Sequence, residues 1–317
     1  MGAVFGSCRY LENCDSRTTQ LTPVQPMDII YRKYDDLLQL VLSEADPRSR
    51  HWLLVNDSPI YVWICTLCYL VFVLWLGPKL MRHREPFVLR PFMIVYNSFL
   101  VLLSLYMVVE IMYSFYLNDY HPICQPFNSK THLQPMELRM AKALWWYFFS
   151  KVIEFTDTVL MVLRKKDSQI TFLHVFHHAS MLNIWWFTII LIPGGQGWLA
   201  SSLNSFVHVI MYSYYLFNLF PSLRPYLWWK KYITQLQLTQ FVIILVHTCN
   251  TYISGCDFPV WSVFMLAAYM FIMIFLFGNF YIKSYLNKPK KSQLNGNHSS
   301  MSNGKVSSHS KSNGKVE

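Results

Sequence analysis

The chain has 317 residues, of which 53% are hydrophobic, 17% are aromatic and only 14% are charged. An ordinary soluble domain carries about 25% charged residues. The low charge, a positive mean hydropathy of +0.25 and several nearly uncharged runs of bilayer length exclude a secreted or cytosolic globular protein and indicate a polytopic helical membrane protein. The formal net charge of +10 does not indicate nucleic-acid binding, because the basic residues lie between the apolar runs.

The first 58 residues precede the first apolar run and are expected to form a lumenal N-terminal segment. No apolar stretch follows a basic start there, so a cleaved signal peptide is not predicted. Residues 28–45 have the pattern of a short amphipathic helix. Gly2 does not indicate myristoylation, because Gly6 stands where that motif requires Ser or Thr.

Seven later segments are long and apolar enough to cross a bilayer, so the predicted fold is all-α, with seven transmembrane helices enclosing a narrow acyl tunnel. They cover residues 59–76, 92–117, 143–163, 170–192, 198–220, 232–252 and 260–282. We expect residues 59–282 to form the catalytic membrane domain. Residues 283–317 are rich in Lys, Ser, Asn and Gly, which predicts a disordered, basic, cytosolic tail.

The orientation follows from where the basic residues fall. The loops after the first, third and fifth spans, together with the tail, carry 17 Lys and Arg residues, whereas the short loops after the fourth and sixth spans carry none. The positive-inside rule therefore predicts a lumenal N-terminus and a cytosolic C-terminus.

Four of the seven cysteines fall on the predicted lumenal side, where disulfides persist: Cys8, Cys14, Cys124 and Cys256. Spacing does not fix connectivity. Cys124 with Cys256 is the preferred pair, and free thiols in the loops stay open as the alternative.

Ionisable side chains within the third span are candidates for function, because each is costly in a bilayer unless paired or hydrated. Lys151, Glu154 and Asp157 follow one another at intervals of three residues, so Lys151 faces Glu154 across one helical turn. A structural ion pair between helices and a catalytic role are both open interpretations.

Two further polar stripes lie in the next spans. His174, His177 and His178 form an HxxHH box on one helical face. Asn204, His208 and Tyr212 repeat at intervals of four in the fifth span, and polar residues between 234 and 240 open the sixth, where helix-to-helix hydrogen bonding is the expected role. A rise of about 1.5 Å per residue places these groups at similar depth, between the bilayer centre and the basic loops.

Three chemistries are candidates for this histidine-rich cavity. A di-iron desaturase or hydroxylase uses three boxes and about eight histidine ligands, but beyond the HxxHH box only His208 and His247 lie within spans. A seven-helix receptor or transporter leaves the imidazole cluster unexplained, and no internal repeat is evident. Acyl transfer fits, because spans two to five lack cysteine and imidazole can be both nucleophile and acid or base.

Four segments in order resemble the signature motifs of the ELO family of very-long-chain fatty acid elongases, and the resemblance spans about residues 30–285. They are KVIEFTDT at 151–158, HVFHH at 174–178, Asn204 with HVIMYSYY at 208–215, and TQLQLTQ at 234–240. HHASMLNIWW and TQLQLTQ are similar to the animal subgroup that elongates polyunsaturated chains.

The resemblance implies condensation of a long-chain, polyunsaturated acyl-CoA with malonyl-CoA to give 3-oxoacyl-CoA, carbon dioxide and CoA. His177 would carry the acyl group and His208 would be its partner, with these two roles exchangeable, while Asn204 orients the oxyanion. His174, His178, Glu154, Asp157 and Lys151 would shape the site. Substrate contacts are expected from Tyr212, Gln235, Gln240, Arg164, Lys166, Lys230 and Lys231. The four basic residues would meet the CoA phosphates, and ordinary positive-inside charge stays open as the alternative for each of them.

The same resemblance implies an endoplasmic reticulum membrane protein that uses malonyl-CoA as co-substrate and needs no cofactor or metal. Expected partners are membrane lipid and the 3-oxoacyl-CoA reductase, dehydratase and enoyl reductase of the elongation cycle, with a homo-oligomer left open. Lys315 stands at the third position from the end without a second lysine beside it, so the dilysine retrieval signal of many relatives is incomplete.

Overall fold

The structure is a computed structural model that describes residues 26–127 and 135–287, and within these ranges every regular element is a helix. Cys8, Cys14 and the predicted tail from residue 288 lie outside the described residues. The amphipathic helix expected near the N-terminus is α1 (Pro26–Ser43). The first long helix starts as α2 (Ile60–Val71), passes through a π-helical turn η1 (Phe72–Leu76) and ends as α3 (Gly77–Met81).

The other six predicted spans also fall on helices. These are α4 (Arg90–Leu117), α5 (Pro135–Leu163), α6 (Phe172–Leu191), α7 (Gly197–Asn218), α8 (Lys230–Ile253) and α9 (Val260–Tyr281). Short turns η3 (Asp167–Gln169) and η4 (Pro221–Tyr226) connect some of them, and η5 (Ile282–Leu286) extends α9 into the first residues of the segment expected to be a tail. The largest shift from the predicted bounds is in α5, which begins at Pro135 rather than near residue 143.

Three stretches are long and apolar enough to cross a bilayer: Ile60–Met81, Arg90–Leu117 and Val260–Leu286. The helices α5 to α8 carry most of the polar side chains singled out above, and these lower their hydropathy. That all seven helices cross the membrane therefore stays a prediction.

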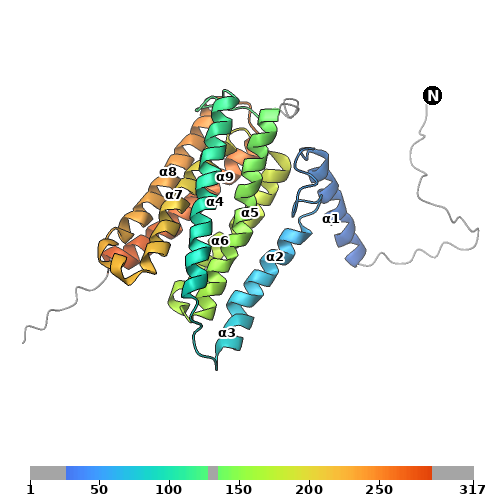
Figure 1. Ribbon diagram of the computed structural model, residues 1–317. Coiled ribbons are helices and arrows are strands. Elements are labelled where there is room, and N and C mark those ends of the chain that lie inside the picture. The colour runs from blue at the N-terminus through green and yellow to red at the C-terminus, as the bar shows by residue number, and fades with distance from the viewer. Residues whose placement is uncertain (1–25, 128–134, 288–317) are drawn as a thin grey trace, which may run out of the picture.

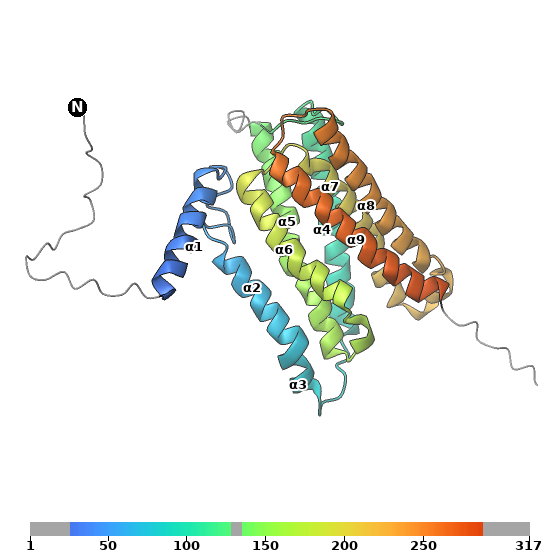
Figure 2. The same cartoon turned by 180° about the vertical axis from the view of Figure 1, so that it is seen from behind.

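Helices α4 to α9 close a ring in which α4 packs on α5, α5 on α6, α6 on α9, α9 on α8, α8 on α7, and α7 on α4 (Figures 1 and 2). Each helix in the ring runs antiparallel to both neighbours. The helix α2–η1–α3 lies outside the ring against α5 and α6, with α1 farther out (Figures 1 and 2). Polar side chains on α5 to α8 can therefore meet inside the ring.

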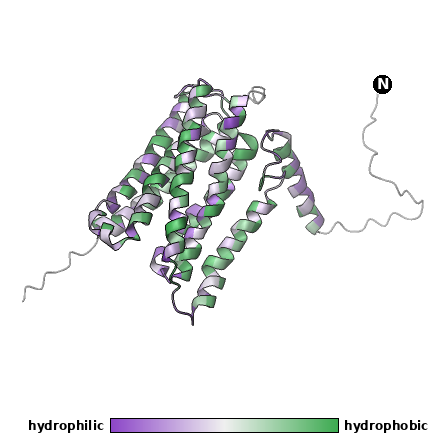
Figure 3. Ribbon diagram, viewed as in Figure 1, coloured by the Kyte–Doolittle hydropathy of each residue, from purple (hydrophilic) through white to green (hydrophobic). Residues whose placement is uncertain are grey.

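The bundle is apolar outside and partly polar inside, as a membrane protein should be. Val95, Leu102 and Phe275 expose 70%, 65% and 73% of their surface, whereas Lys151 and Glu154 each expose 1%. Figure 3 shows hydrophobic residues over much of the long helices and hydrophilic residues on α1. Exposed apolar area on this scale marks contact with lipid or another apolar partner.

We call one end of the bundle the disulfide end, because Cys124 and Cys256 are joined there by a disulfide with a Cα–Cα distance of 5.5 Å. The bond links the loop after α4 to the loop between α8 and α9. Hydrogen bonds from Gln196 Nε2 to Ile123 O (2.8 Å) and between the His247 ring and Pro122 O (3.0 Å) hold the same loop against α7 and α8. The other end, where α3, α5, α7 and η5 finish, is the basic end.

The segment between α1 and α2 also closes the disulfide end. Asp46 N–H donates to Ile190 O at 2.8 Å, and the indole N–H of Trp145 donates to Leu53 O at 3.2 Å. Asp46 is buried and forms a two-bond ion pair with Arg48. These contacts fix residues 45–59 on α5 and α6.

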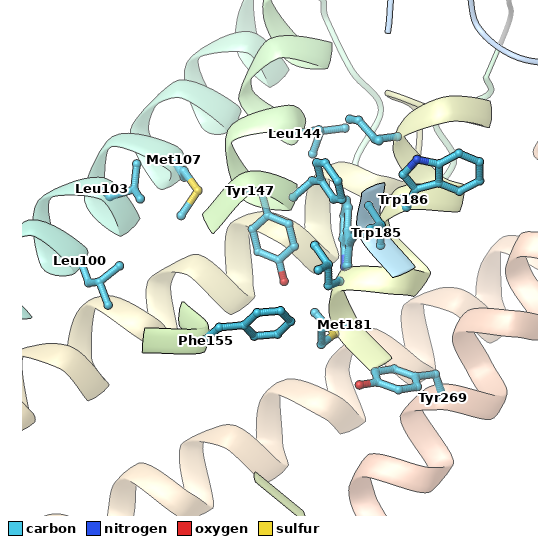
Figure 4. Close-up of a cluster of buried hydrophobic side chains, with 14 of the residues drawn as sticks. Leu100, Leu103, Met107, Leu144, Tyr147, Phe155, Met181, Trp185, Trp186 and Tyr269 are labelled. Atoms are coloured by element: carbon cyan, nitrogen blue, oxygen red, sulfur yellow. The ribbon is translucent and has the colours of Figure 1, made fainter. Parts of the chain in front are cut away.

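Aromatic side chains pack inside the ring beside the polar residues. The rings of Tyr147 and Trp185 lie 4.4 Å apart at an interplanar angle of 63°, and Figure 4 shows them next to each other, with Phe155, Met181 and Tyr269 nearby. Tyr147 and Phe155 belong to α5, the helix that also carries Lys151 and Glu154. The buried aromatic cluster therefore supports the backbone that positions the charged groups.

Candidate active site

The HxxHH box occupies the first two turns of α6. Thr171 caps this helix, and its side-chain oxygen accepts the backbone N–H of His174 at 3.3 Å, which is the expected role of an N-cap threonine. The rings of His174 and His178 are 4.5 Å apart, and those of His177 and His178 are 5.5 Å apart. The box is therefore a compact cluster of three imidazoles, as the spacing predicts.

Lys151 and Glu154 form a buried ion pair on α5. Lys151 Nζ donates to Glu154 Oε1 at 2.7 Å, and Ser150 Oγ donates to the same oxygen at 3.0 Å. The ammonium group also lies 4.4 Å from the centre of the Tyr147 ring, a cation–π contact. Within the described residues Glu154 Oε2 is buried and has no hydrogen-bond partner.

His208 on α7 approaches this carboxylate. Its Nδ1 lies 3.4 Å from Glu154 Oε1 and makes no hydrogen bond to the described part of the chain. Catalytic hydrogen bonds are often long in the unliganded state and shorten when substrate binds. The geometry therefore presents Glu154 as the group that orients the His208 ring.

The amide of Asn204 is held from two sides. Its Oδ1 accepts a hydrogen bond from Tyr147 Oη at 2.6 Å, and its Nδ2 donates to Gln240 Oε1 at 3.4 Å. The amide nitrogen has two hydrogens, so one N–H remains for a substrate oxygen. The contacts bring Asn204 and Gln240 together inside the ring, as the sequence analysis anticipated for Asn204.

Asp157 and Tyr212 form a second polar contact between α5 and α7. Tyr212 Oη donates to Asp157 Oδ2 at 2.7 Å, and the phenol ring lies 5.6 Å from that of His208. Tyr212 is fully enclosed, with 1% of its surface exposed. Its hydroxyl is committed to Asp157, which gives it a structural contact beside His208.

The remaining predicted substrate contacts lie away from the imidazoles. Gln235 Nε2 donates to Tyr281 Oη at 2.7 Å, a contact between α8 and α9. Arg164 and Lys166 follow α5, and Lys230 and Lys231 begin α8, so all four are at the basic end; all except Arg164 are exposed. The structure does not bring these five residues into the histidine cluster.

A mainly apolar cavity lies on the other side of the cluster, toward the disulfide end. It lies between the ends of α6, α7, α8 and α9 and is partly open to the outside. Trp185, Ile244 and Leu266 contribute apolar walls, and Gln196 and His247 contribute polar ones. Ile244 follows Gln240 by one turn of α8, so the cavity begins about one turn beyond the polar groups.

Comparison with known proteins places this site in a family. The family model for ELO, described as the GNS1/SUR4 family, matches residues 54–293. The chain belongs to the ELO family. All the site residues described above fall within the matched range.

Curated relatives in this family are similar over most of the chain. Very long chain fatty acid elongase 5 of Xenopus tropicalis is 45% identical over 287 residues, which is 90% of this chain and 95% of the relative. Elongase 2 of Mus musculus is 46% identical over 81% of this chain and 86% of the relative, and elongase 5 of Homo sapiens is 47% identical over 78% and 81%.

The structure adds residues to this ELO site that the sequence analysis did not single out. Tyr147 and Ser150 contact Asn204 and Glu154, and both lie on α5 within one turn of Lys151. A search for polar residues on the Lys151 face could have found them. Tyr69 on α2 also reaches the cluster through Thr158, and nothing in its apolar surroundings indicates this.

In residues 26–127 and 135–287 no three His, Cys, Asp or Glu side chains are grouped so as to hold a metal ion.

Proposed function

We propose that the protein is the condensing enzyme of fatty acid elongation and that it transfers the acyl chain through a histidine. The observation that carries this proposal is the 3.4 Å approach of His208 Nδ1 to the buried Glu154 carboxylate, beside the imidazole cluster of α6. Membership of the ELO family and the names of the elongase relatives support the reaction class.

In the first step, an unprotonated ring nitrogen of His177 attacks the thioester carbonyl of acyl-CoA. The tetrahedral intermediate collapses, the carbon–sulfur bond breaks, and the CoA thiolate leaves and takes up a proton. The product is an N-acyl imidazole on His177. Neutral imidazole is a competent nucleophile, and a second imidazole within reach can move the proton.

In the second step, malonyl-CoA loses carbon dioxide, and the electron pair of the broken carbon–carbon bond becomes the carbanion equivalent at C2. That carbon attacks the acyl carbonyl, the bond to the His177 nitrogen breaks, and 3-oxoacyl-CoA is released. The departing imidazole nitrogen takes up one proton from solvent, delivered through the second imidazole, and so recovers its original state. Atoms, charge and electrons then balance without an oxidant or a metal.

His208 and Asn204 have supporting roles in this proposal. Glu154 orients His208 so that Nδ1–H faces the carboxylate and Nε2 is the acid or base. The uncommitted N–H of Asn204 stabilises negative charge on the carbonyl oxygen, as donors of this kind do in acyl transfer. His174, His178 and Asp157 shape the site, and Lys151 holds Glu154.

The substrate lies along the bundle axis. The apolar tail enters the cavity near Trp185 and Leu266, and the CoA phosphates meet Arg164, Lys166, Lys230 and Lys231 at the basic end. Burial of each methylene contributes about 0.8 kcal/mol. Burial of a long chain in the cavity therefore increases the affinity for the substrate. Gln235 and Gln240 contact the substrate along α8.

Among acyl-CoA substrates, the enzyme prefers polyunsaturated chains, and it acts in the endoplasmic reticulum membrane. The HHASMLNIWW and TQLQLTQ segments support this preference.

The protein crosses the membrane seven times with a lumenal N-terminus, and its product passes to a reductase, a dehydratase and a second reductase. Protease added to sealed microsomes is expected to remove the C-terminal tail; a protected tail would contradict this orientation.

The test is product analysis with purified protein and a panel of acyl-CoA substrates. We expect malonyl-CoA-dependent gain of two carbons, with polyunsaturated chains used fastest and with full activity after stringent chelation. A product whose formation requires oxygen and stoichiometric iron would contradict condensation and would support desaturase or hydroxylase chemistry. Equal rates for saturated and polyunsaturated chains would refute only the preference for polyunsaturated chains.

A further inference from the structure

We propose that Tyr69 is a positioning residue that, through the hydroxyl of Thr158, holds the imidazole of His174 in one tautomer. Only the kinetic consequence of this proposal rests on the proposed function. The tautomer itself follows from the hydrogen bonds of the structure.

A chain of two hydrogen bonds links α2 to the histidine box. Tyr69 Oη lies 2.9 Å from Thr158 Oγ1, and Thr158 Oγ1 lies 2.9 Å from His174 Nε2. Tyr69 exposes 4% of its surface and Thr158 exposes none. The His174 ring is partly exposed, but water does not compete for the two hydroxyls. The protons between Tyr69 Oη, Thr158 Oγ1 and His174 Nε2 are therefore shared among these three atoms.

The order of donors is decided by counting protons. If Tyr69 donates to Thr158 and Thr158 donates to His174 Nε2, both hydroxyl protons have acceptors. If His174 Nε2–H donates instead, either the Tyr69 proton or the Thr158 proton is left without an acceptor among the described residues. An unsatisfied buried donor costs about 1 to 3 kcal/mol.

Thr158 also differs from other helical threonines of the bundle. Thr188 and Thr248 each donate to the carbonyl one turn back on their own helix, at 3.2 and 2.7 Å. In the described structure Thr158 makes no such bond, and its proton remains for His174 Nε2. His174 is therefore the Nδ1–H tautomer.

In this tautomer His174 has a different role from the other histidines of the site. The Nε2 lone pair of His174 is occupied by Thr158, so that nitrogen is not available to attack a thioester or take a proton. The nucleophile and base are then left to His177, His178 and His208. His174 acts by holding its place beside His178, with ring centres 4.5 Å apart.

The docking of α2 explains how a helix outside the ring sets this contact. The Tyr69 ring stacks on Phe155 of α5 at 4.1 Å with an interplanar angle of 11°. About two turns farther along, Gly77 lies so close to α5 that an added Cβ would come within 2.7 Å of Val162 Cγ1. The π-helical turn between Tyr69 and Gly77 is a feature that often marks functional sites.

The chain offers a matched control on the same helix. Asn183 Nδ2 donates to Thr66 Oγ1 at 3.0 Å, so Thr66 also joins α2 to α6 by a side-chain hydrogen bond. This bond does not involve the histidine box. Thr66→Val removes a docking bond of α2, whereas Tyr69→Phe removes the hydroxyl that precedes Thr158 and keeps the stacked ring.

The experiment records nitrogen-15 NMR spectra of histidine-labelled, full-length protein in lipid nanodiscs, with the His174 signals assigned by their loss in His174→Gln. We expect an acceptor-type Nε2 in the wild type and in Thr66→Val. In Tyr69→Phe, Thr158 is free to turn to its own helix, so we expect a mixture of tautomers. Thr158→Val should lose the preference, and Thr158→Ser, which keeps the hydroxyl, should retain it.

The kinetic readout is steady-state CoA release from acyl-CoA in the presence of malonyl-CoA by the same variants. Loss of one hydrogen bond predicts a fall in kcat of roughly tenfold or less for Tyr69→Phe, with KM nearly unchanged, and no change for Thr66→Val. A protonated Nε2 on His174 in the wild type, or His174 signals unchanged in both Tyr69→Phe and Thr158→Val, would overturn the proposal. Absence of CoA release from the wild type would instead refute the proposed function and leave the tautomer test valid.

Discussion

The two ends of the bundle differ in how their connecting segments are held. At the disulfide end, Asp46, Val55 and Gln196 are buried, and the segments that contain them bond to helices or to one another. At the basic end, Val88, Phe172 and Trp228 expose 89%, 72% and 73% of their surface. The connecting segments of the disulfide end are held by a disulfide and by hydrogen bonds. Those of the basic end are charged and largely exposed.

This difference indicates the direction in which a substrate would enter. His177 lies five residues inside α6 from the basic end, a depth of about 8 Å. The apolar cavity lies beyond the histidines toward the disulfide end. A long acyl chain that enters from the basic end would reach the imidazoles with its thioester while its tail occupies the cavity.

The largest expected effect on activity comes from changing the reacting groups, which lie between the two ends of the bundle. His208→Ala should lower the rate of overall elongation by about a hundredfold or more, because it removes a general acid or base from a site closed to water. The measurement is two-carbon elongation by purified protein. The matched control is His83→Ala, an exposed histidine at the basic end, and a His208→Ala enzyme with more than a tenth of the control's rate would contradict the assigned role.

The buried ion pair is expected to give the next largest effect, measured as stability. Lys151→Met leaves the Glu154 carboxylate without its cation, which costs about 3 to 5 kcal/mol when one partner of a buried pair is removed. The double variant Lys151→Met, Glu154→Gln should recover much of this loss, as measured by thermal unfolding in detergent. Lys142→Met, on the exposed side of the same helix, should be neutral, and equal losses for Lys142 and Lys151 would show that burial of the pair is unimportant.

The closed end can be opened by removing its disulfide. The bond spans 132 residues, and the chain-entropy relation for a loop of this length gives at most about 5 kcal/mol. Cys124→Ser with Cys256→Ser should therefore lower Tm, while elongation well below that temperature is largely kept, because the histidines lie at the other side of the cavity. Cys249→Ser, an exposed free thiol, is the control. An equal Tm for both variants would contradict the claim that the disulfide stabilises this end of the bundle.

The smallest expected effect is at the basic end. Lys230→Ala with Lys231→Ala should raise KM for acyl-CoA by a few fold, leave kcat unchanged, and lose its effect at high salt, because exposed charges are screened. Lys142→Ala removes a positive charge near the disulfide end and should not change KM. If Lys142→Ala raised KM as much, the basic end would have no special part in CoA binding.

Much of this arrangement could be predicted from the sequence, because helical spacing determines local geometry. The i, i+3 and i, i+4 intervals are sufficient to predict the Lys151–Glu154 contact and the clustering of His174 with His178. Length and hydropathy are sufficient to predict where most long helices lie. His208 likewise lies where the polar stripe of its span predicts.

The contacts that the sequence could not predict are those between helices. Tyr69 sits in an apolar run, and only the packing of α2 on α5 brings its hydroxyl to Thr158. Gln235 and Gln240 belong to one motif, yet Gln235 bonds Tyr281 whereas Gln240 reaches Asn204. Helix rotation decides such pairs, and no periodicity within a single helix determines it.

The most direct test of histidine-linked acyl transfer is the reaction with acyl-CoA alone. Without malonyl-CoA, the wild type should release CoA in an amount up to the enzyme concentration and gain the acyl mass on the peptide that contains His177. His177→Ala should lose both signals. No CoA release until malonyl-CoA is added, with no trapped acyl-enzyme, would contradict the covalent mechanism, and an adduct on His208 would exchange the two histidines.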